Sequence, residues 1–275
     1  MPRSYTDTHV TSRAQAFSLA TLSGVFLVLS FPKFGHPAVA WVALTPLLVA
    51  ACARGSLTRA FWLGLTTGGI YLGGSLYWLS NVMARYGSIN IAGAIVINAV
   101  FVAYLALYPA LFAVVMRRLS MAFGVSALVA APCVWTATEL GRMYVFTGFP
   151  WVLLGYSQAT VLPIAQAASV VGVFGVSAMV AAVSAALAGV AVVRAWRPLA
   201  VVAVAIAAVA GWGSVRLRSA ALTQGGVPLR VGVVQPNVLE EEREAAGGGP
   251  EILRRTVSLA RQAVAQGATF VVLPE

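Results

Sequence analysis

Acidic side chains are almost absent from most of this 275-residue chain. Between Thr8 and Leu239 the only acidic residue is Glu139. Charged residues make up 9% of the sequence, against about 25% in ordinary soluble domains. Hydrophobic residues make up 60%, and the mean hydropathy is +0.87. Such a composition cannot cover a folded domain of this size with a charged surface, so a single soluble domain is excluded.

Clusters of basic residues are also lacking, although the net charge is +10. The arginines stand singly or in pairs between apolar runs. A nucleic-acid-binding face needs Lys and Arg gathered together, so no nucleic-acid partner is expected. Isolated basic residues between apolar runs are typical of the cytoplasmic loops of membrane proteins.

Cysteine is scarce, with only Cys52 and Cys133 in the sequence. Both lie in apolar surroundings, and their spacing matches no metal-ligand pattern. We expect two buried thiols that act as small apolar residues, and the sequence indicates neither a metal nor a cofactor.

Long apolar runs are abundant, and a window of about 20 residues predicts about seven transmembrane helices. The expected spans are residues 14–31, 37–53, 60–80, 89–116, 122–140, 161–193 and 197–213. The first is not a signal peptide, because no small-residue cleavage site leads into a polar mature region. The fold class expected is a multi-pass α-helical membrane domain over residues 1–215, followed by a soluble segment over 216–275.

The basic residues between these spans predict the orientation. If the N-terminus is cytoplasmic, eight basic residues fall inside and three outside. The inside set is Arg3, Arg13, Arg54, Arg59, Arg117, Arg118, Arg194 and Arg197, and the outside set is Lys33, Arg85 and Arg142. This is a positive-inside pattern. An odd number of spans then places the residues after about 216 outside the cytoplasm.

The soluble segment has an α/β pattern. Residues 229–235 and 269–273 are short apolar runs that predict strands, and apolar positions in 252–264 recur near helical spacing. Gly267 is a plausible C-cap of that helix. A β-α-β unit of about 45 residues is too small to close a core alone. We therefore expect it to be the opening unit of a larger α/β domain.

Aromatic side chains gather at the outer ends of the third and fifth spans and in the loops that follow. They are Tyr77, Trp78, Tyr86, Tyr144, Phe146, Phe149, Trp151 and Tyr156. One interpretation is an ordinary aromatic belt at the membrane surface. The segment Thr147–Trp151 favours another, because Gly148 and Pro150 beside large rings suggest a rigid loop dipping toward the membrane.

Two carboxylates are candidates for function. Glu139 lies near a membrane span, where an unpaired charge is costly. It either forms a structural pair with Arg142, three residues on, or serves a polar cavity that admits a lipid headgroup. Glu275 ends the second apolar run, and carboxylates at the C-terminal ends of strands commonly face active sites in α/β folds.

Several motifs, taken together and in order, carry a family resemblance. They are Gly74-Ser75-Leu76-Tyr77-Trp78, Ala131-Pro132-Cys133-Val134-Trp135, Thr138-Glu139, Thr147-Gly148-Phe149-Pro150-Trp151 and Gly155-Tyr156-Ser157-Gln158. This set closely resembles the apolipoprotein N-acyltransferases of the bacterial envelope. Residues 231–237 look like the opening strand of that family's nitrilase-like (carbon–nitrogen hydrolase) domain, and residues 271–275 look like the strand that ends in its catalytic glutamate.

The resemblance implies a multi-pass protein of the bacterial plasma (inner) membrane. Such an enzyme moves an acyl chain from a phospholipid donor to the N-terminal diacylglyceryl-cysteine of a lipoprotein. A cysteine thiolate attacks the ester, and the α-amino group opens the resulting thioester, with a glutamate as base and a lysine as oxyanion stabiliser. By position, Glu275 matches the catalytic glutamate. Trp78, Glu139 and Trp151 match membrane-side positions where acyl-chain or headgroup contacts are expected.

The sequence departs from the family pattern after Glu275. The family's lysine, nucleophilic cysteine and last transmembrane helix lie downstream, and residues 216–275 contain neither Lys nor Cys. We expect an N-acyltransferase truncated at its catalytic glutamate and inactive by itself. The alternative is a non-catalytic membrane module that binds lipid or lipoprotein. A transporter is a third possibility, but no inverted repeat stands out.

Overall fold

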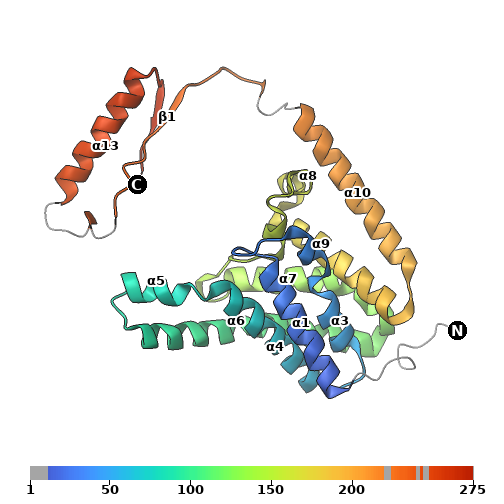
Figure 1. Cartoon of the computed structure of the whole chain (residues 1–275). Coiled ribbons are helices and arrows are strands. Elements are labelled where there is room, and N and C mark those ends of the chain that lie inside the picture. The colour runs from blue at the N-terminus through green and yellow to red at the C-terminus, as the bar shows by residue number, and fades with distance from the viewer. Residues whose placement is uncertain (1–11, 220–223, 240–241, 244–247, 275) are drawn as a thin grey trace. The chain divides into compact units, whose positions relative to one another are not determined.

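The computed structural model describes residues 12–219, 224–239, 242–243 and 248–274 (Figure 1). Its contacts divide the chain into two compact units, Met1–Ser219 and Ala220–Glu275. The first is helical, and the second is a small α/β unit.

The described part of the first unit consists of α-helices joined by short connections. They are α1 (Arg13–Leu29), α2 (Pro37–Ala43), α3 (Thr45–Cys52), α4 (Leu57–Leu76), α5 (Leu79–Tyr86), α6 (Ile91–Phe123), α7 (Ala131–Tyr144), α8 (Leu162–Ala165), α9 (Ala168–Val193) and α10 (Trp196–Ser219). Three connections are 3-10 helices: η2 (Gly124–Ala130), η3 (Val145–Thr147) and η4 (Leu154–Gln158). The fold is therefore mostly helical, as the composition predicts.

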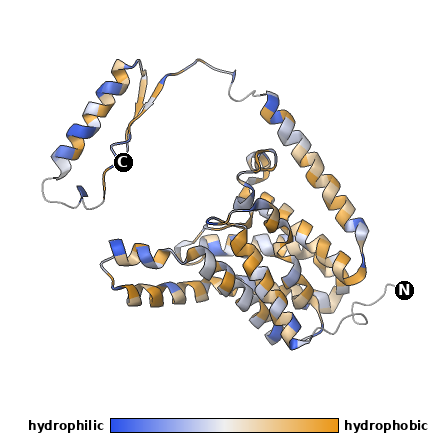
Figure 2. Cartoon of the chain, in the orientation of Figure 1, coloured by the Kyte–Doolittle hydropathy of each residue, from blue (hydrophilic) through white to orange (hydrophobic). Residues whose placement is uncertain are grey.

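Three stretches among the described residues are long and apolar enough to cross a membrane: Ile91–Thr147, Ala168–Val193 and Trp196–Ser219. The first of them divides at Gly124, whose φ of 60° ends α6. Two further apolar helices, Arg13–Leu29 and Pro37–Cys52, are shorter. Hydrophobic residues dominate α6, α9 and α10 (Figure 2). These features support a membrane-embedded helical unit, while the number of about seven spans stays a prediction.

The expected span 37–53 is not one continuous helix. It consists of α2 and α3, seven and eight residues long, which meet at Leu44. Pro46, in the first turn of α3, accounts for the break. Proline has no amide hydrogen, and its ring clashes with the carbonyl four residues earlier, so a helix starts at such a residue more readily than it continues through it.

Helix α4 packs between α1 and α6 through small residues. A Cβ atom on Gly64 would lie 2.3 Å from the Pro109 carbonyl oxygen, and one on Gly68 would lie 2.9 Å from the Ala106 Cα. The spacing Gly64-x-x-x-Gly68 thus lets two backbones come into direct contact. Close approach of this kind is the main source of helix–helix affinity in a membrane, where burial of apolar surface contributes little.

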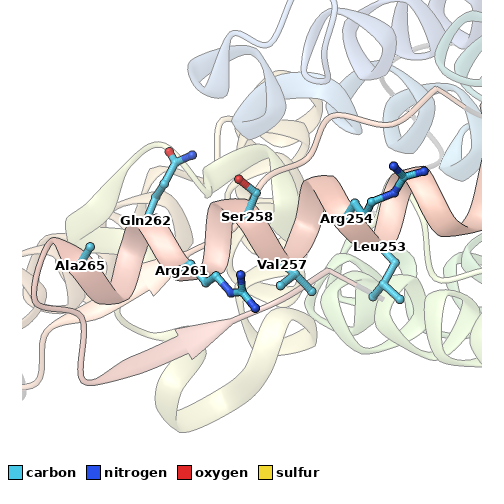
Figure 3. A pocket seen from close by; sticks show the side chains of 7 residues that line it. All are labelled: Leu253, Arg254, Val257, Ser258, Arg261, Gln262 and Ala265. Atoms are coloured by element: carbon cyan, nitrogen blue, oxygen red, sulfur yellow. The ribbon is translucent and has the colours of Figure 1, made fainter.

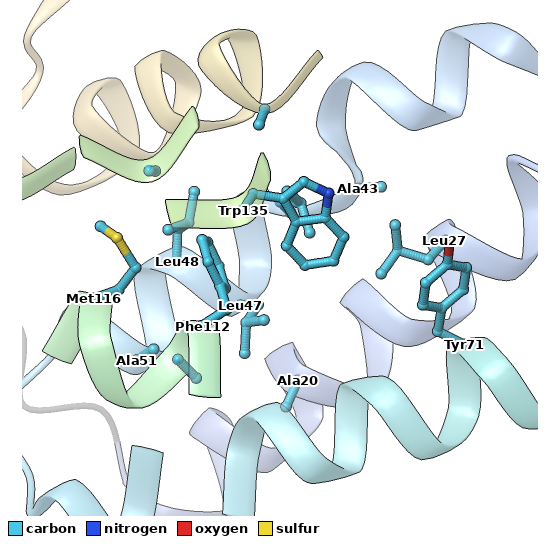
Figure 4. Packing of buried hydrophobic residues seen from close by; sticks show 14 of the residues in the cluster. Ala20, Leu27, Ala43, Leu47, Leu48, Ala51, Tyr71, Phe112, Met116 and Trp135 are labelled. Carbon is cyan, nitrogen blue, oxygen red and sulfur yellow. The ribbon is translucent and has the colours of Figure 1, made fainter. Parts of the chain in front are cut away.

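Larger side chains fill the centre of the helical unit (Figure 4). Phe112 of α6 and Trp135 of α7 meet edge to face, with ring centroids 5.2 Å apart. Cys52 is buried in this cluster as expected, but Cys133 is exposed. The expectation of two buried thiols is therefore wrong for Cys133. Both faces of a membrane helix are apolar, so hydropathy does not reveal which face turns inward.

The second unit is a β-α-β arrangement. Strand β1 (Val231–Val233) pairs in parallel with β2 (Phe270–Val272), and α13 (Gly248–Ala265) lies between them in the sequence. Gly267 adopts φ 90° just after α13, and the amides of Gly267 and Ala268 bond the carbonyls of Val264 and Ala263. This is a Schellman cap, which confirms Gly267 as the helix terminator. The relation of this unit to a nitrilase-like domain stays a prediction.

Candidate functional site

The segment from residue 145 to 158, between α7 and α8, has an irregular backbone held by many side chains. We call it the Trp151 loop. Phe146, Thr147 and Val152 have φ of 51°, 73° and 50°, which non-glycine residues rarely adopt. Such conformations persist only where the surroundings hold them in place. The loop is therefore more than a plain turn. This agrees with the sequence analysis, in which Gly148 and Pro150 beside large rings suggest a rigid loop.

Gly148 is required at its place in this loop. Its φ is 83°, and a Cβ atom there would lie 1.8 Å from the carbonyl oxygen of Met143. The loop folds back onto the last turn of α7, where the Phe149 amide donates to the Arg142 carbonyl at 2.9 Å. Glycine allows both the dihedral angle and the close approach.

Glu139 anchors the far side of the loop. Its Oε1 accepts hydrogen bonds from the Leu154 amide at 2.7 Å and from the Trp135 indole nitrogen at 2.9 Å. The residue is only 2% exposed, and its Oε2 has no hydrogen-bond partner among the described residues. Both bonds are shielded from water, which strengthens them.

A second anchor acts on the carbonyl of Val152. It accepts a bond from Arg142 Nη2 at 3.4 Å and another from the Tyr71 hydroxyl of α4. Helix α7 extends to Tyr144, so Arg142 is buried within it and does not lie in an outer loop as the expected spans place it. No direct hydrogen bond or ion pair joins Glu139 and Arg142 among the described residues; the two side chains instead hold neighbouring parts of the loop.

The space beside Glu139 is small. A cavity of about 10 Å³ is lined by Tyr71, Tyr108, Pro109, Trp135, Thr138, Glu139 and Arg142. This is about the minimum room for one water molecule. A lipid headgroup does not fit there in this conformation.

The loop presents its aromatic rings to Trp78, which lies between α4 and α5, and to α6. Trp151 stacks on Trp78 with ring centroids 5.2 Å apart and an interplanar angle of 23°, and on Phe149 at 5.6 Å. Phe149 meets Phe101 of α6 edge to face at 4.9 Å. The structure thus brings together Trp78 and Trp151, two predicted site residues 73 positions apart. Trp151 remains 48% exposed, so the stack is open on one side.

The other predicted residues divide into two groups. Tyr77, Tyr86, Tyr144, Phe146 and Tyr156 are exposed, and their place in an interfacial belt stays a prediction. Glu275 lies outside the described residues, and its role stays a prediction. The sequence interpretation missed Tyr71 and Ser177, whose hydroxyls bond Val152 and the Gly155 amide. The only signal for Ser177 is a polar residue in the apolar run of α9.

The groove found in the second unit is not an enclosed site. A groove of about 650 Å³ is lined by seven residues of α13 alone, as Figure 3 shows. One helix face cannot enclose a ligand, and its Arg254–Glu251 ion pair at 3.1 Å is solvent-exposed. No group of three or more His, Cys, Asp or Glu side chains converges in the part of the chain that the structure describes. The expected lack of a metal stays a prediction.

Comparison with known proteins identifies the helical unit. A family profile described as the apolipoprotein N-acyltransferase N-terminal domain matches residues 23–186. The chain belongs to the apolipoprotein N-acyltransferase family. The matched segment contains Trp78, Glu139, Trp151 and all of the Trp151 loop.

Curated members of the apolipoprotein N-acyltransferase family are similar over different lengths. The protein from Geobacter metallireducens is 42% identical over 156 residues, which cover 57% of this chain and 30% of that protein. The protein from Pasteurella multocida is 34% identical over 57% of this chain and 29% of its own length. The protein from Chromobacterium violaceum is 33% identical over 93% of this chain and 48% of its own length. The chain therefore spans between about a third and a half of these relatives.

Proposed function

We propose that this chain forms the membrane part and the start of the extracytoplasmic domain of an apolipoprotein N-acyltransferase. Residues 1–215 supply the transmembrane helices, and residues 216–275 supply the opening β-α-β unit of a nitrilase-like domain. The protein lies in the bacterial plasma membrane with its N-terminus in the cytoplasm. The family membership and the positive-inside distribution of arginines support this placement.

The observation that carries the proposal is the Trp78–Trp151 stack on an anchored loop. A flat aromatic surface, held in one orientation and half exposed beside apolar helices, suits contact with an acyl chain. The proposed substrates are a phospholipid acyl donor and a diacylated lipoprotein acceptor, brought together at the membrane surface.

The three membrane-side residues have different roles in this proposal. Trp78 and Trp151 contact the acyl chain directly. Glu139 positions the loop through its bonds to Leu154 and Trp135. Glu275 serves as the general base of the thioester chemistry. The 275-residue polypeptide alone does not complete that chemistry, because residues 216–275 contain neither the nucleophilic Cys nor the Lys.

A non-catalytic module that binds lipid or lipoprotein is the second candidate. The stack and its anchored loop would serve binding equally well. Only a measurement of acyl transfer therefore distinguishes the enzyme from the binding module.

The test is an enzyme made by joining this chain to the remaining part of the Chromobacterium violaceum relative. We expect transfer of a labelled acyl chain from phospholipid to a diacylated lipopeptide. Trp151→Ala should lower kcat/KM about tenfold or more, because loss of a large aromatic contact costs more than 1.4 kcal/mol. Trp62→Ala is the matched control, since Trp62 is an exposed tryptophan of α4 outside the stack.

Two results would count against this function. A fusion that inserts and folds but transfers no acyl chain, while still binding the lipopeptide, would favour the binding module. Equal losses for Trp151→Ala and Trp62→Ala would remove the stack from the substrate site.

A further inference from the structure

An apolar groove lies on the helical unit outside the Trp151 loop. Helices α7, α9 and α10 and the connection η2 line a groove of about 640 Å³. The part contributed by α9 consists of small residues, Ala182, Ala185, Ala186 and Gly189. No residue of the Trp151 loop lines this groove.

The small side chains along α9 leave this groove unfilled. A Cβ atom added to Gly189 would meet only Leu128 Cδ1 at 3.8 Å and Ala195 Cβ at 3.9 Å, which are ordinary contacts. Helix α10 forms the other wall with Val201 and Val202, and it buries little of its own surface inside the protein. The groove is therefore apolar, and α9 and α10, which line it, are long and apolar enough to cross a membrane.

One side chain that lines the groove is positively charged. Arg197 lines it at the start of α10, is exposed, and makes no hydrogen bond or ion pair with any described residue. Among the described residues of the helical unit the only acidic side chain is Glu139, which is bonded to Trp135 and Leu154. Trp196, next to Arg197, is 63% exposed, as is usual for indoles at the headgroup level. The groove thus combines an apolar lining with one cationic side chain.

We propose that this groove binds one anionic phospholipid, with an acyl chain along the small residues of α9 and the phosphate on Arg197. Basic pockets between membrane helices bind anionic headgroups in this way. A zwitterionic lipid would bring an ammonium group to Arg197 and to Arg194 nearby in sequence, with no described carboxylate to pair it. The proposal requires only that the helical unit is embedded in a membrane. It concerns a lipid that is held in place and not the acyl donor.

The test measures lipid retention by the purified 275-residue chain in a non-ionic detergent, using native mass spectrometry. We expect one dioleoyl phosphatidylglycerol per chain, bound about tenfold more tightly than the phosphatidylethanolamine with the same acyl chains. Arg197→Gln should weaken phosphatidylglycerol binding about tenfold and remove the preference between the two lipids. Arg118→Gln, which removes an exposed arginine outside the groove, should change binding less than twofold.

A second pair of variants tests the apolar part of the groove. Ala182→Phe places a ring in it and should abolish retention of both lipids, whereas Ala191→Phe, at an exposed position of α9 outside the groove, should not. Circular dichroism and gel filtration identify any variant that has unfolded; Arg197→Gln alters only an exposed side chain and remains informative in that case. Three results would overturn the proposal. They are equal binding of both lipids, equal effects of the two variants in either pair, and displacement of the lipid by millimolar inorganic phosphate.

Discussion

Glu139 shows how one carboxylate controls a loop in an apolar environment. Its Oε1 satisfies two buried donors, the Leu154 amide and the Trp135 indole. Removing the side chain would leave both donors unpaired in a place that water does not reach, which costs about 1–3 kcal/mol for each group. The same carboxylate keeps Leu154, three residues after Trp151, in register with α7.

Replacing Glu139 with Gln tests its carboxyl group. Glutamine has an acceptor oxygen at the same place, so we expect normal membrane insertion of the fused enzyme. An amide nitrogen, which is a donor, takes the place of the buried Oε2, and the acyl-transfer rate should fall about tenfold, as expected from a loss of roughly 1.4 kcal/mol. The measurement compares the transfer rate with the amount of protein in the membrane.

The matched control is Glu251→Gln, which removes an exposed carboxylate on α13. It should leave both quantities unchanged. Full acyl transfer by the Glu139→Gln enzyme at normal expression would leave Glu139 with a structural role only.

At the scale of elements, α4 has two glycine pairs with opposite surroundings. Gly64 and Gly68 press against the backbone of α6, whereas a Cβ atom on Gly69 would meet nothing within 4 Å and one on Gly73 only Val102 Cγ1 at 3.8 Å. Both pairs have the spacing Gly-x-x-x-Gly, so the motif alone does not show which pair makes the contact. Because Gly64 and Gly68 have no room for a side chain whereas Gly69 and Gly73 do, substitutions at the two pairs should have opposite effects on stability.

Gly64→Leu should destabilise the helical unit. The new side chain would meet the Pro109 carbonyl and Ala110 Cα and force α4 and α6 apart, at a cost of at least about 1–3 kcal/mol. Thermal unfolding in detergent should shift downward by roughly 5–10 °C. Gly69→Ala should instead hold or slightly raise the midpoint, because alanine favours the helix and fills empty space. A larger loss for Gly69→Ala than for Gly64→Leu would contradict the packing of α4 on α6.

At the scale of the whole molecule, the distribution of arginines predicts the topology. A reporter that is active only outside the cytoplasm should be active when fused after Leu222 and silent when fused after Arg118. The physical reason is that short loops rich in Arg and Lys stay on the cytoplasmic side during insertion. Blue-white colony assays with equal expression of both fusions make the comparison. The opposite pattern would overturn the proposed orientation.

The positions of the cysteines predict whether the isolated polypeptide can form an acyl thioester. Both of its cysteines, Cys52 and Cys133, lie in the helical unit, and residues 216–275 have none. Covalent enzymes lose roughly a million-fold in rate without their nucleophile. The purified 275-residue chain, incubated with labelled phospholipid, should therefore carry no hydroxylamine-labile acyl group, whereas the fused enzyme should. A labelled thioester on the isolated chain would show that this proposal misplaces the nucleophile.

The sequence by itself determined which helices and strands the fold contains and to which family the chain belongs. Hydropathy predicts apolar helices because twenty or so apolar residues in a row have few other stable environments. Two short apolar runs, with helical spacing between them and Gly267 as the helix terminator, predict the β-α-β order. Such predictions succeed because strands, helices and caps depend on residues close together in the chain. Trp78, Glu139 and Trp151 were identified by motifs, which are also local.

Only the tertiary structure decided which of these residues meet, and how. Whether Cys133 faces inward, and whether Arg142 binds Glu139 or Val152, depends on the rotation of each helix about its axis. In an apolar segment every face has the same hydropathy, so nothing local sets that rotation. It follows from close packing, such as Gly64 and Gly68 on α6, between residues that are distant in sequence. The stack of Trp78 on Trp151 and the narrow space beside Glu139 result from that packing, which is why no pattern in the sequence shows them.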